Sequence, residues 1–111
     1  MPTDSAPDAG DIVWPQCDPQ AGHEQTGHRP AVVVERTSYN RATGMMLCCP
    51  TTTPIRGYPF EVPVAGVIPS VIFAHQVKNF DWRARQAKPK GRVSPAELAE
   101  ARSKLRALLE L

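Results

Sequence analysis

The chain has 111 residues, with a hydrophobic fraction of 41%, an aromatic fraction of 6% and a formal net charge of +2. This length fits one domain, and the composition is typical of a globular protein rather than of a disordered or membrane-spanning chain. The apolar runs are too short for a transmembrane helix, and the N-terminus lacks the basic start and apolar run of a signal peptide. We therefore expect a cytoplasmic protein with no membrane partner.

Short strands separated by turn residues are predicted for most of the chain. Residues 1–9 are polar and contain two prolines, and we expect them to form a flexible tail before a single domain over residues 10–111. Runs that are rich in β-branched residues, or that alternate between apolar and polar residues, predict strands. These runs are residues 11–14, 31–35, 45–49, 58–64 and 71–77.

The C-terminal segment has a different pattern, which predicts an amphipathic helix from Pro95 to about Glu110. Ser94 is a good N-cap, Pro95 suits the first helical position, and Glu97 completes a capping box. Several short strands followed by one helix favour a mainly β fold, a small and strongly bent antiparallel sheet or barrel closed by that helix. The apolar residues at helical spacing are Leu98, Ala101, Leu105, Leu108 and Leu109.

Three cysteines, Cys17, Cys48 and Cys49, are an odd number and lack the C-x-x-C spacing of a zinc site. We expect buried thiols rather than disulfides. On a strand, Cys48 and Cys49 would face opposite sides of the sheet. The sequence has no evident cluster of metal ligands, so neither a metal nor a cofactor is expected.

Positive charge is concentrated near the end of the predicted strands. Between residues 78 and 92, six basic residues are accompanied by Asp81 as the one acid. Such a segment is often only a solvated surface, but it can also attract a phosphate polymer. The six residues are Lys78, Arg83, Arg85, Lys88, Lys90 and Arg92.

Protonatable and anion-binding side chains gather between residues 22 and 30, directly before a run of three valines. Arg29 lies next to the predicted buried strand, where a charge is tolerated only if the guanidinium reaches solvent, a carboxylate or an anion. This placement favours a functional role for Arg29. Glu24 could also be a solvated loop acid, and His28 a structural hydrogen-bonding residue.

A second polar cluster, Thr51, Thr52 and Thr53, follows the predicted 45–49 strand. Threonine on a strand is ordinary. A threonine hydroxyl at a strand end can also bind a phosphate oxygen alongside an arginine. The two polar clusters can form one site only if the two strand ends meet.

Six segments resemble a known protein family: GDIVW at 10–14, GHEQTGHRPAVVV at 22–34, YN at 39–40, TGMMLCCPTT at 43–52, RGYPFEV at 56–62 and QVKNFDWRAR at 76–85. They closely resemble the MazF family of toxin–antitoxin ribonucleases. The resemblance implies an SH3-like small barrel of curved antiparallel strands with a C-terminal helix, assembled as a homodimer. It also implies cleavage within single-stranded RNA, and a MazE-like antitoxin that competes with RNA near Lys78, Arg83 and Arg85.

The resemblance implies roles for four residues. The family's essential arginine falls on Arg29, and its essential hydroxyl group falls on Thr52, with the register among residues 51–53 left open. Glu24 and His28 fall in supporting positions. The chain departs from the family in two respects. His75 occupies a position that is usually acidic, and Pro15, Gln16 and Cys17 replace a stretch that often ends in an aromatic residue.

RNA carries an internal nucleophile, its 2′-hydroxyl, so cleavage needs no metal if the protein supplies three functions. It must remove the 2′-proton, stabilise the charged phosphorane and protonate the leaving 5′-oxygen. The planar fork of Arg29 suits the phosphorane, and Thr52 would orient the phosphate. Glu24 is the preferred base and His28 the preferred acid, with the exchanged roles left open. The expected products carry a 2′,3′-cyclic phosphate and a 5′-hydroxyl.

Selection of a short base motif requires splayed bases held by stacking and edge contacts. The side chains expected to bind RNA are Trp14, Gln76, Lys78, Arg83 and Arg85. Two other functions use the same kind of barrel. One is a CcdB-like toxin that binds DNA gyrase without nuclease activity, and the other is a non-catalytic RNA-binding barrel. The joint presence of Glu24, Arg29 and Thr52 favours the endoribonuclease over both.

Overall fold

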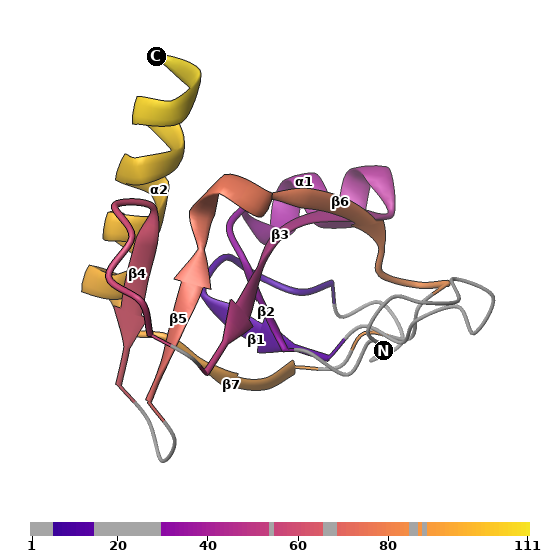
Figure 1. Cartoon of the computed structure of the whole chain (residues 1–111). Helices are drawn as coiled ribbons and strands as arrows, with labels where there is room; N and C mark the ends of the chain where they lie inside the picture. The colour runs from indigo at the N-terminus through magenta and orange to yellow at the C-terminus, as the bar shows by residue number, and fades with distance from the viewer. Residues whose placement is uncertain (1–5, 15–29, 54, 66–68, 85–86, 88) are drawn as a thin grey trace, which may run out of the picture.

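A computed structural model of the chain describes residues 6–14, 30–53, 55–65, 69–84, 87 and 89–111. These residues form a curled sheet and a C-terminal helix that packs against one end of it (Figure 1). The strands are β1 (Asp11–Val13), β2 (Ala31–Val33), β3 (Met45–Thr52), β4 (Glu61–Val64), β5 (Ser70–Phe73), β6 (Lys78–Asp81) and β7 (Pro89–Arg92). The helices are α1 (Thr37–Thr43), the short 3₁₀ helix η3 (Ala74–Gln76) and α2 (Pro95–Leu109).

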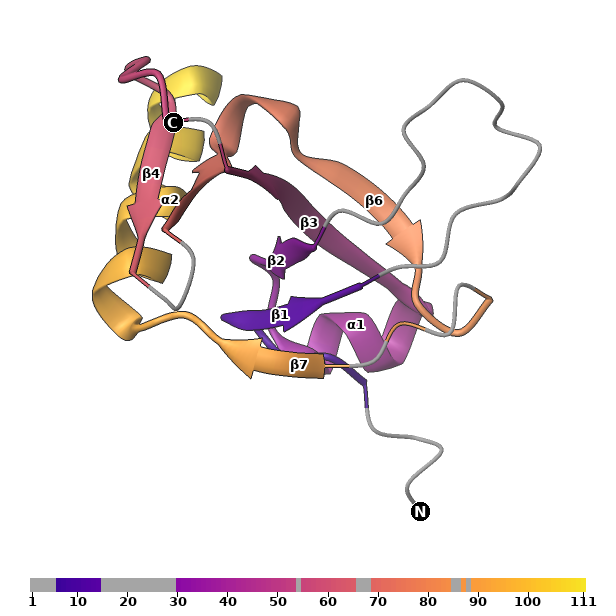
Figure 2. The ribbon, with the colours of Figure 1, turned by 60° about the horizontal axis from the view of Figure 1, so that its bottom comes forward.

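The described strands form one antiparallel sheet in the order β4-β5-β3-β2-β1-β7, and β6 also pairs with β3. Figure 2 shows how this sheet curls, so that β4 and β5 turn away from β1 and β2. Strand β3 joins the two parts. Its residues 45–48 pair with β6, whereas Thr51 and Thr52 pair with β5. The expectation of a mainly β fold of curved antiparallel strands with a C-terminal helix is confirmed.

Strand β3 is longer than the predicted 45–49 strand, because it continues through a proline. Pro50 has no backbone N–H to donate, which normally excludes proline from a central strand. Ala31 of β2 lies opposite Pro50 on one side. On the other side Pro50 lies between Cys48, the last residue paired with β6, and Thr51, the first residue paired with β5. Neither β5 nor β6 pairs with Pro50, so the strand continues through it to Thr52.

The predicted 58–64 and 71–77 strands have different boundaries in the structure. The predicted 58–64 strand begins only at Glu61, because a turn precedes it. The carboxylate of Glu61 holds this turn by accepting hydrogen bonds from the backbone N–H groups of Arg56 (3.2 Å) and Gly57 (2.9 Å). The second is wrong as a single strand. It covers most of β5 and then η3, and β6 begins only after it, because β5 and β6 pair with different parts of β3 and η3 connects them.

Helix α1 and strands β6 and β7 were not predicted from the sequence. The sequence TSYNRAT of α1 contains few strong helix formers, and tertiary contacts hold it in place. The side-chain amide of the buried Asn40 donates to the carbonyls of Pro7 (2.7 Å) and Glu35 (2.9 Å), and the backbone carbonyl of Asn40 accepts from the indole N–H of Trp82 (2.7 Å). Strand β7 is exposed throughout and pairs only at its two ends with β1.

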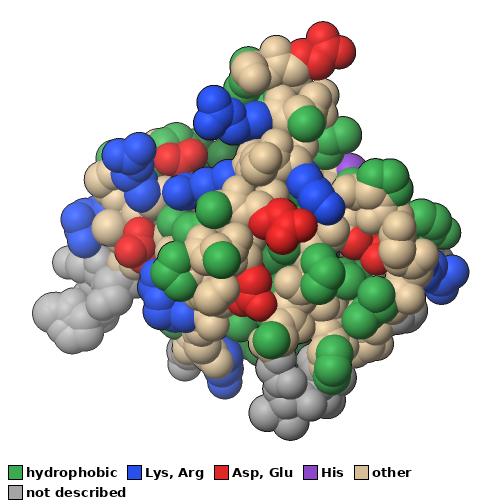
Figure 3. Space-filling model, turned by 90° about the vertical axis from the view of Figure 1, so that its left-hand side faces the viewer, with side chains coloured by type: hydrophobic (Ala, Val, Ile, Leu, Met, Phe, Trp, Pro, Cys, Tyr) green, Lys and Arg blue, Asp and Glu red, His purple; other side chains and the backbone are tan. Residues whose placement is uncertain are grey.

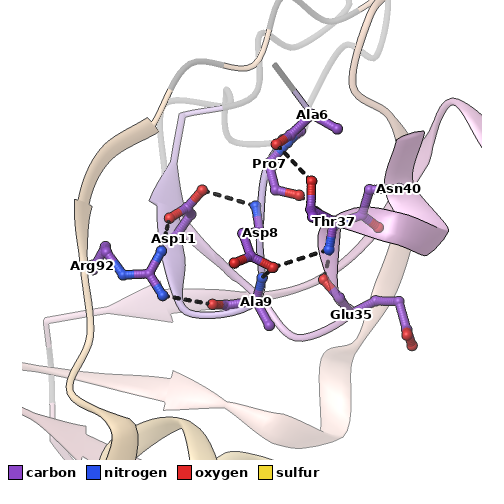
Figure 4. Close-up of polar contacts among 9 residues, drawn as sticks. All are labelled: Ala6, Pro7, Asp8, Ala9, Asp11, Glu35, Thr37, Asn40 and Arg92. Atoms are coloured by element: carbon purple, nitrogen blue, oxygen red, sulfur yellow. Dashed lines mark hydrogen bonds and ion pairs between the residues drawn. The ribbon is translucent and has the colours of Figure 1, made fainter. Parts of the chain in front are cut away.

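The predicted flexible tail is wrong for residues 6–9. Asp8 accepts hydrogen bonds from the backbone N–H groups of Ala9 (2.8 Å) and Thr37 (3.0 Å), so it joins the N-terminal segment to α1 (Figure 4). The half-exposed Arg92 of β7 forms an ion pair with Asp11 and donates to the carbonyl of Ala9 at 3.0 Å. Residues 1–5 lie outside the described residues.

Helix α2 has the predicted capping box. The Ser94 hydroxyl accepts from the backbone N–H of Glu97 at 3.1 Å, and the Glu97 carboxylate accepts from the N–H of Ser94 at 2.8 Å. Ala101 is buried, and Leu98 and Leu105 pack partly against the core. The other two residues of the predicted apolar face do not pack inward, because α2 extends past the sheet (Figure 1): Leu108 and Leu109 are exposed.

Cys48 and Cys49 are fully buried in two different core clusters, as expected from their alternation along β3. Burial raises the pKa of both thiols to about 12, so both are neutral packing groups at physiological pH. Cys17 lies outside the described residues. No described helix is both long and apolar enough to span a membrane.

Candidate functional site

The start of β2 and the end of β3 meet, which was the condition for the two polar clusters to form one site. Ala31 pairs with Pro50, so Pro30 lies beside Thr51. The carbonyl oxygen of Pro30 accepts two hydrogen bonds from Thr51, one from its backbone N–H and one from its hydroxyl group, both at 3.0 Å. Arg29 directly precedes Pro30 in the chain.

The three consecutive threonines have three different environments. Thr51 is 7% exposed, and its hydroxyl is committed to Pro30. Thr52 is partly exposed, and it lies on the opposite face of the strand because side chains alternate. Thr53 follows the strand and is exposed. The Thr52 hydroxyl makes no hydrogen bond to another described residue, so within this part of the chain it is free to meet a ligand.

Four predicted site residues lie outside the described residues: Glu24, His28, Arg29 and Arg85. Their roles therefore remain predictions. Of the catalytic set, the structure describes Thr52 alone. Among the described residues, no group of three or more His, Cys, Asp or Glu side chains is placed to hold a metal ion.

Trp14 leaves the sheet at the same end as Pro30 and Thr51. It follows Val13, and Val13 pairs with Ala31 in the neighbouring strand. Its side chain is 41% exposed, so an indole face is available at this edge of the sheet. The sequence prediction that Trp14 contacts RNA is compatible with this position.

Gln76 and Lys78 are exposed and lie on η3 and β6. Lys78 pairs with Cys48, four residues before Thr52 on β3, which corresponds to about 13 Å along a strand. The side-chain nitrogen of Gln76 lies 3.4 Å from Nε2 of the neighbouring His75. Both predicted RNA-binding residues are therefore within a few nucleotides' reach of Thr52.

Arg83 lies farther from Thr52. It follows β6, whose last residue Asp81 pairs with Met45 at the other end of β3, seven residues or about 23 Å from Thr52. The exposed Arg83 guanidinium stacks 4.8 Å from the centre of the buried Trp82 ring. The structure thus does not bring Arg83 into the strand-end site, and it would contact a distant part of a bound polymer.

A cluster of rings lies near the site, and the sequence analysis did not predict it. Phe60 lies 3.8 Å from His75 and 5.2 Å from Tyr58, measured between ring centres, and Phe73 lies 5.3 Å from His75. Phe73 is two residues along β5 from Val71, the partner of Thr52, so it shares the sheet face of Thr52. The aromatic residues of GYPF at 57–60 were the sequence feature that could have indicated this cluster. Alone they do not show that Phe60 contacts rings from β5 and η3.

An apolar surface adjoins the ring cluster at Phe60 and continues onto α2. A groove of about 230 Å³ is lined by Pro59, Phe60, Lys104, Ala107 and Leu108. Beyond it Leu109 and Leu111 are 62% and 83% exposed. Figure 3 shows the face with α2 and β4, where hydrophobic side chains lie among basic and acidic ones.

Comparison with known families gives a match over residues 8–109 to the PemK-like, MazF-like toxins of type II toxin–antitoxin systems. The chain belongs to this family. It is 50% identical to the Endoribonuclease toxin MazF of Escherichia coli K12 over 104 residues, which cover 93% of this chain and 94% of that protein. It is 37% identical to the Endoribonuclease toxin ChpB of the same strain, with coverage of 91% and 92%. The resemblance inferred from the six sequence segments is confirmed.

Solved structures of the MazF family have the same fold. A crystal structure of MazF from Deinococcus radiodurans has a TM-score of 0.83 and 44% identity, and the match covers 96% of this chain and 98% of that one. A MazE-MazF crystal structure from the same organism has a TM-score of 0.82 and 38% identity, with the same coverage. The curled sheet and C-terminal helix described above are thus the fold of MazF-like toxins.

Proposed function

We propose that the chain is the toxin of a type II toxin–antitoxin system and acts as an endoribonuclease that inhibits translation by cutting RNA. The observation that carries this proposal is the 50% identity to Endoribonuclease toxin MazF along nearly the whole length of both chains. The meeting of Pro30 with the threonine cluster supports it, because the chain neighbour of Arg29 then lies beside the candidate hydroxyl groups.

The proposed reaction is metal-independent transesterification of single-stranded RNA. The 2′-oxygen attacks the adjacent phosphorus, and Glu24 or His28 takes its proton. The bond from phosphorus to the 5′-oxygen breaks, and the other residue of this pair protonates the leaving oxygen. The products therefore carry a 2′,3′-cyclic phosphate and a 5′-hydroxyl.

Arg29 and Thr52 act on the phosphate in this mechanism. A guanidinium can hold two phosphate oxygens at once and scarcely gives up a proton, so Arg29 stabilises the charge of the phosphorane. The Thr52 hydroxyl donates to a phosphate oxygen, which its partial exposure and its lack of a hydrogen-bond partner among the described residues allow.

RNA contacts extend from this site in two groups. Trp14, Gln76 and Lys78 bind the nucleotides near the cut, because all three are exposed around the strand-end site. Arg83 and Arg85 supply longer-range attraction to phosphates. Such attraction is salt-dependent and carries little base selectivity.

The partners follow from the same proposal. The family name includes an antitoxin, and solved MazE-MazF structures are among those that the chain resembles. We expect a MazE-like antitoxin whose acidic tail folds along the basic surface, a homodimer, and a cytoplasmic location.

The deciding experiment incubates the purified protein with a long single-stranded RNA of mixed sequence in EDTA and sequences the new 5′ ends. We expect cuts at a short recurrent motif, with 5′-hydroxyl ends, and little cleavage of fully paired RNA. Cleavage that disappears in EDTA and returns with magnesium or manganese would overturn the metal-independent mechanism. No cleavage under either condition, with inhibition of DNA gyrase instead, would overturn the endoribonuclease proposal.

Control by an antitoxin is tested by competition. Saturating antitoxin is expected to displace a labelled RNA that is protected from cleavage by 2′-deoxy substitution. Unchanged RNA affinity in the saturated complex would contradict competition for one surface.

A further inference from the structure

The last rung between β2 and β3 has an unusual hydrogen-bond pattern. Pro30 and Thr51 lie opposite each other, and the N–H of Thr51 donates to the carbonyl of Pro30 at 3.0 Å. In an antiparallel pair of this type the two residues normally exchange two backbone hydrogen bonds. Pro30 has no N–H, so the returning bond to Thr51 cannot form. The backbone alone therefore holds this rung by a single bond.

The Thr51 side chain supplies a second bond at this rung. Its hydroxyl donates to the same carbonyl oxygen of Pro30 at 3.0 Å, and the residue is 7% exposed. A carbonyl oxygen has two lone pairs and can accept both donors. Because water competes poorly at a buried position, this bond is a stable substitute for the missing proline N–H.

The position of this rung gives it a role beyond strand pairing. It is the point at which β3 leaves β2 and joins β5, since Thr51 pairs with Ile72 and Thr52 with Val71. The rung is thus adjacent in the chain to both candidate phosphate-binding residues. Thr52 follows Thr51 on β3, and Arg29 precedes Pro30 in the sequence.

We propose that Thr51 is a positioning residue of the RNA-cleaving site, whose hydroxyl completes the rung to Pro30 and so holds the end of β3 in register for Thr52. The expected effect of Thr51 on the cleavage rate rests on the proposed endoribonuclease function. Thr51 itself does not touch RNA, because its hydroxyl is turned toward Pro30. Small misplacements of a catalytic group are costly to the rate, whereas RNA binding is spread over many contacts.

The test uses three variants. Thr51→Val keeps the shape and removes the hydroxyl, and Thr51→Ser keeps the hydroxyl. Thr43→Val is the matched control, because the Thr43 hydroxyl also donates to a backbone carbonyl, that of Tyr39 at 2.8 Å, and accepts from the N–H of Met45 at 3.1 Å, at the opposite end of β3 from Thr52. Single-turnover cleavage of RNA in EDTA and affinity for a 2′-deoxy-protected RNA are measured for each variant.

We expect Thr51→Val to lower the single-turnover rate about tenfold, the factor that corresponds to about 1.4 kcal/mol, the upper end for one net hydrogen bond. RNA affinity should change less than twofold. Thr51→Ser and Thr43→Val should both stay within about twofold of the original rate. Hydrogen exchange of the Thr51 amide should be faster in Thr51→Val and unchanged in Thr43→Val.

Two results would overturn the proposal. One is a folded Thr51→Val protein with an unchanged cleavage rate. The other is a Thr51→Val protein in which cleavage rate, RNA affinity and thermal stability all fall together, with the same losses in Thr51→Ser. That result would show a merely structural role for Thr51. Failure of the unsubstituted protein to cut RNA would instead count against the proposed function. If the unsubstituted protein does not cut RNA, hydrogen exchange at residue 51 still tests whether the hydroxyl completes the rung to Pro30. Unchanged amide exchange in Thr51→Val would refute this hydrogen bond as a support of the rung.

Discussion

Arg29 is expected to carry the largest single share of the rate enhancement, because it meets a charge that develops only in the transition state. We predict that Arg29→Ala lowers turnover by at least about 10²-fold, or roughly 3 kcal/mol, by analogy with the loss of one oxyanion-stabilising donor. RNA affinity should fall less, since the basic segment between residues 78 and 92 still attracts phosphates. Single-turnover cleavage and RNA affinity provide the two measurements.

Two further variants make this prediction specific. Arg29→Lys should restore little activity, because an ammonium keeps the charge but loses the two-pronged geometry. Arg41→Ala removes an exposed arginine at the end of α1 and should leave cleavage unchanged. Near-normal cleavage by a folded Arg29→Ala protein would remove Arg29 from the site.

The threonine assignment is a second prediction about single residues. Thr52→Val should lower the cleavage rate by about tenfold to 10²-fold, because one hydrogen bond to the phosphate is lost in the transition state. Thr53→Val should change it less than twofold, since Thr53 is exposed and lies beyond the end of β3. The reverse pattern of rates would move the catalytic hydroxyl to Thr53.

Among the secondary structure elements, α2 is attached to the sheet by polar contacts in addition to its apolar face. The Arg102 guanidinium donates to the carbonyl of Val34 at 2.8 and 3.0 Å, and Lys104 donates to that of Glu61 at 2.8 Å. At the N-terminus, Glu97 also accepts from the N–H of Ala65 at 2.9 Å. Glu97 therefore joins the helix start to the segment after β4.

These contacts predict how stability depends on pH. Hydrogen bonds from the N–H groups of Ser94 and Ala65 lower the pKa of Glu97 below its ordinary value of 4.5. A lowered pKa in the folded state means that the stabilisation is complete above pH 4.5 and is lost as the pH falls through the folded-state pKa. Glu97→Gln should make the unfolding free energy less dependent on pH below 4.5, measured by urea unfolding.

Glu100→Gln is the matched control, because Glu100 lies on the same helix and makes only an exposed i,i+4 pair with Lys104 at 3.6 Å. It should alter the pH dependence little. Ser94→Ala should cost about 1 kcal/mol of stability at neutral pH, the usual value for a lost N-cap. A pH profile that is the same in Glu97→Gln and the unsubstituted protein would contradict the role of the carboxylate.

For the whole molecule, the apolar surface at the end of α2 predicts self-association. Exposed apolar groups that cluster beside a groove are typical of a protein–protein contact, and Leu108 is 51% exposed at the groove edge. We predict a homodimer at micromolar concentration that Leu108→Asp weakens at least tenfold, measured by light scattering and sedimentation.

Ala99→Asp provides the control for this prediction. Ala99 is exposed on the same helix, and nine residues at about 100° each place it on the opposite side from Leu108. Its substitution should leave the dimer intact. A monomeric unsubstituted protein would refute the homodimer, and an equal effect of both variants would remove this surface from the interface.

Local features of the sequence by themselves determined the elements whose signals are short-range. The capping box and the spacing of Leu98, Ala101 and Leu105 predicted α2, because a helix is built from contacts within one turn. The run of valines predicted β2, and the adjacent cysteines predicted buried thiols on opposite faces of β3. The sequence motifs also led to the correct family and to Thr52 as the candidate hydroxyl.

Only the tertiary structure decided features that depend on partners far away in the chain. Residues 6–9 are ordered because Asp8 and Pro7 bond to α1, and α1 forms despite weak propensity for the same reason. Pro50 stays within a strand because its position falls between two partners of β3. Likewise, Thr51 and Thr52 have similar local sequence, but pairing with Pro30 commits one hydroxyl and leaves the other exposed. Hydrogen bonds between strands that are distant in the chain, rather than local propensity, thus set which threonine hydroxyl is committed within the sheet.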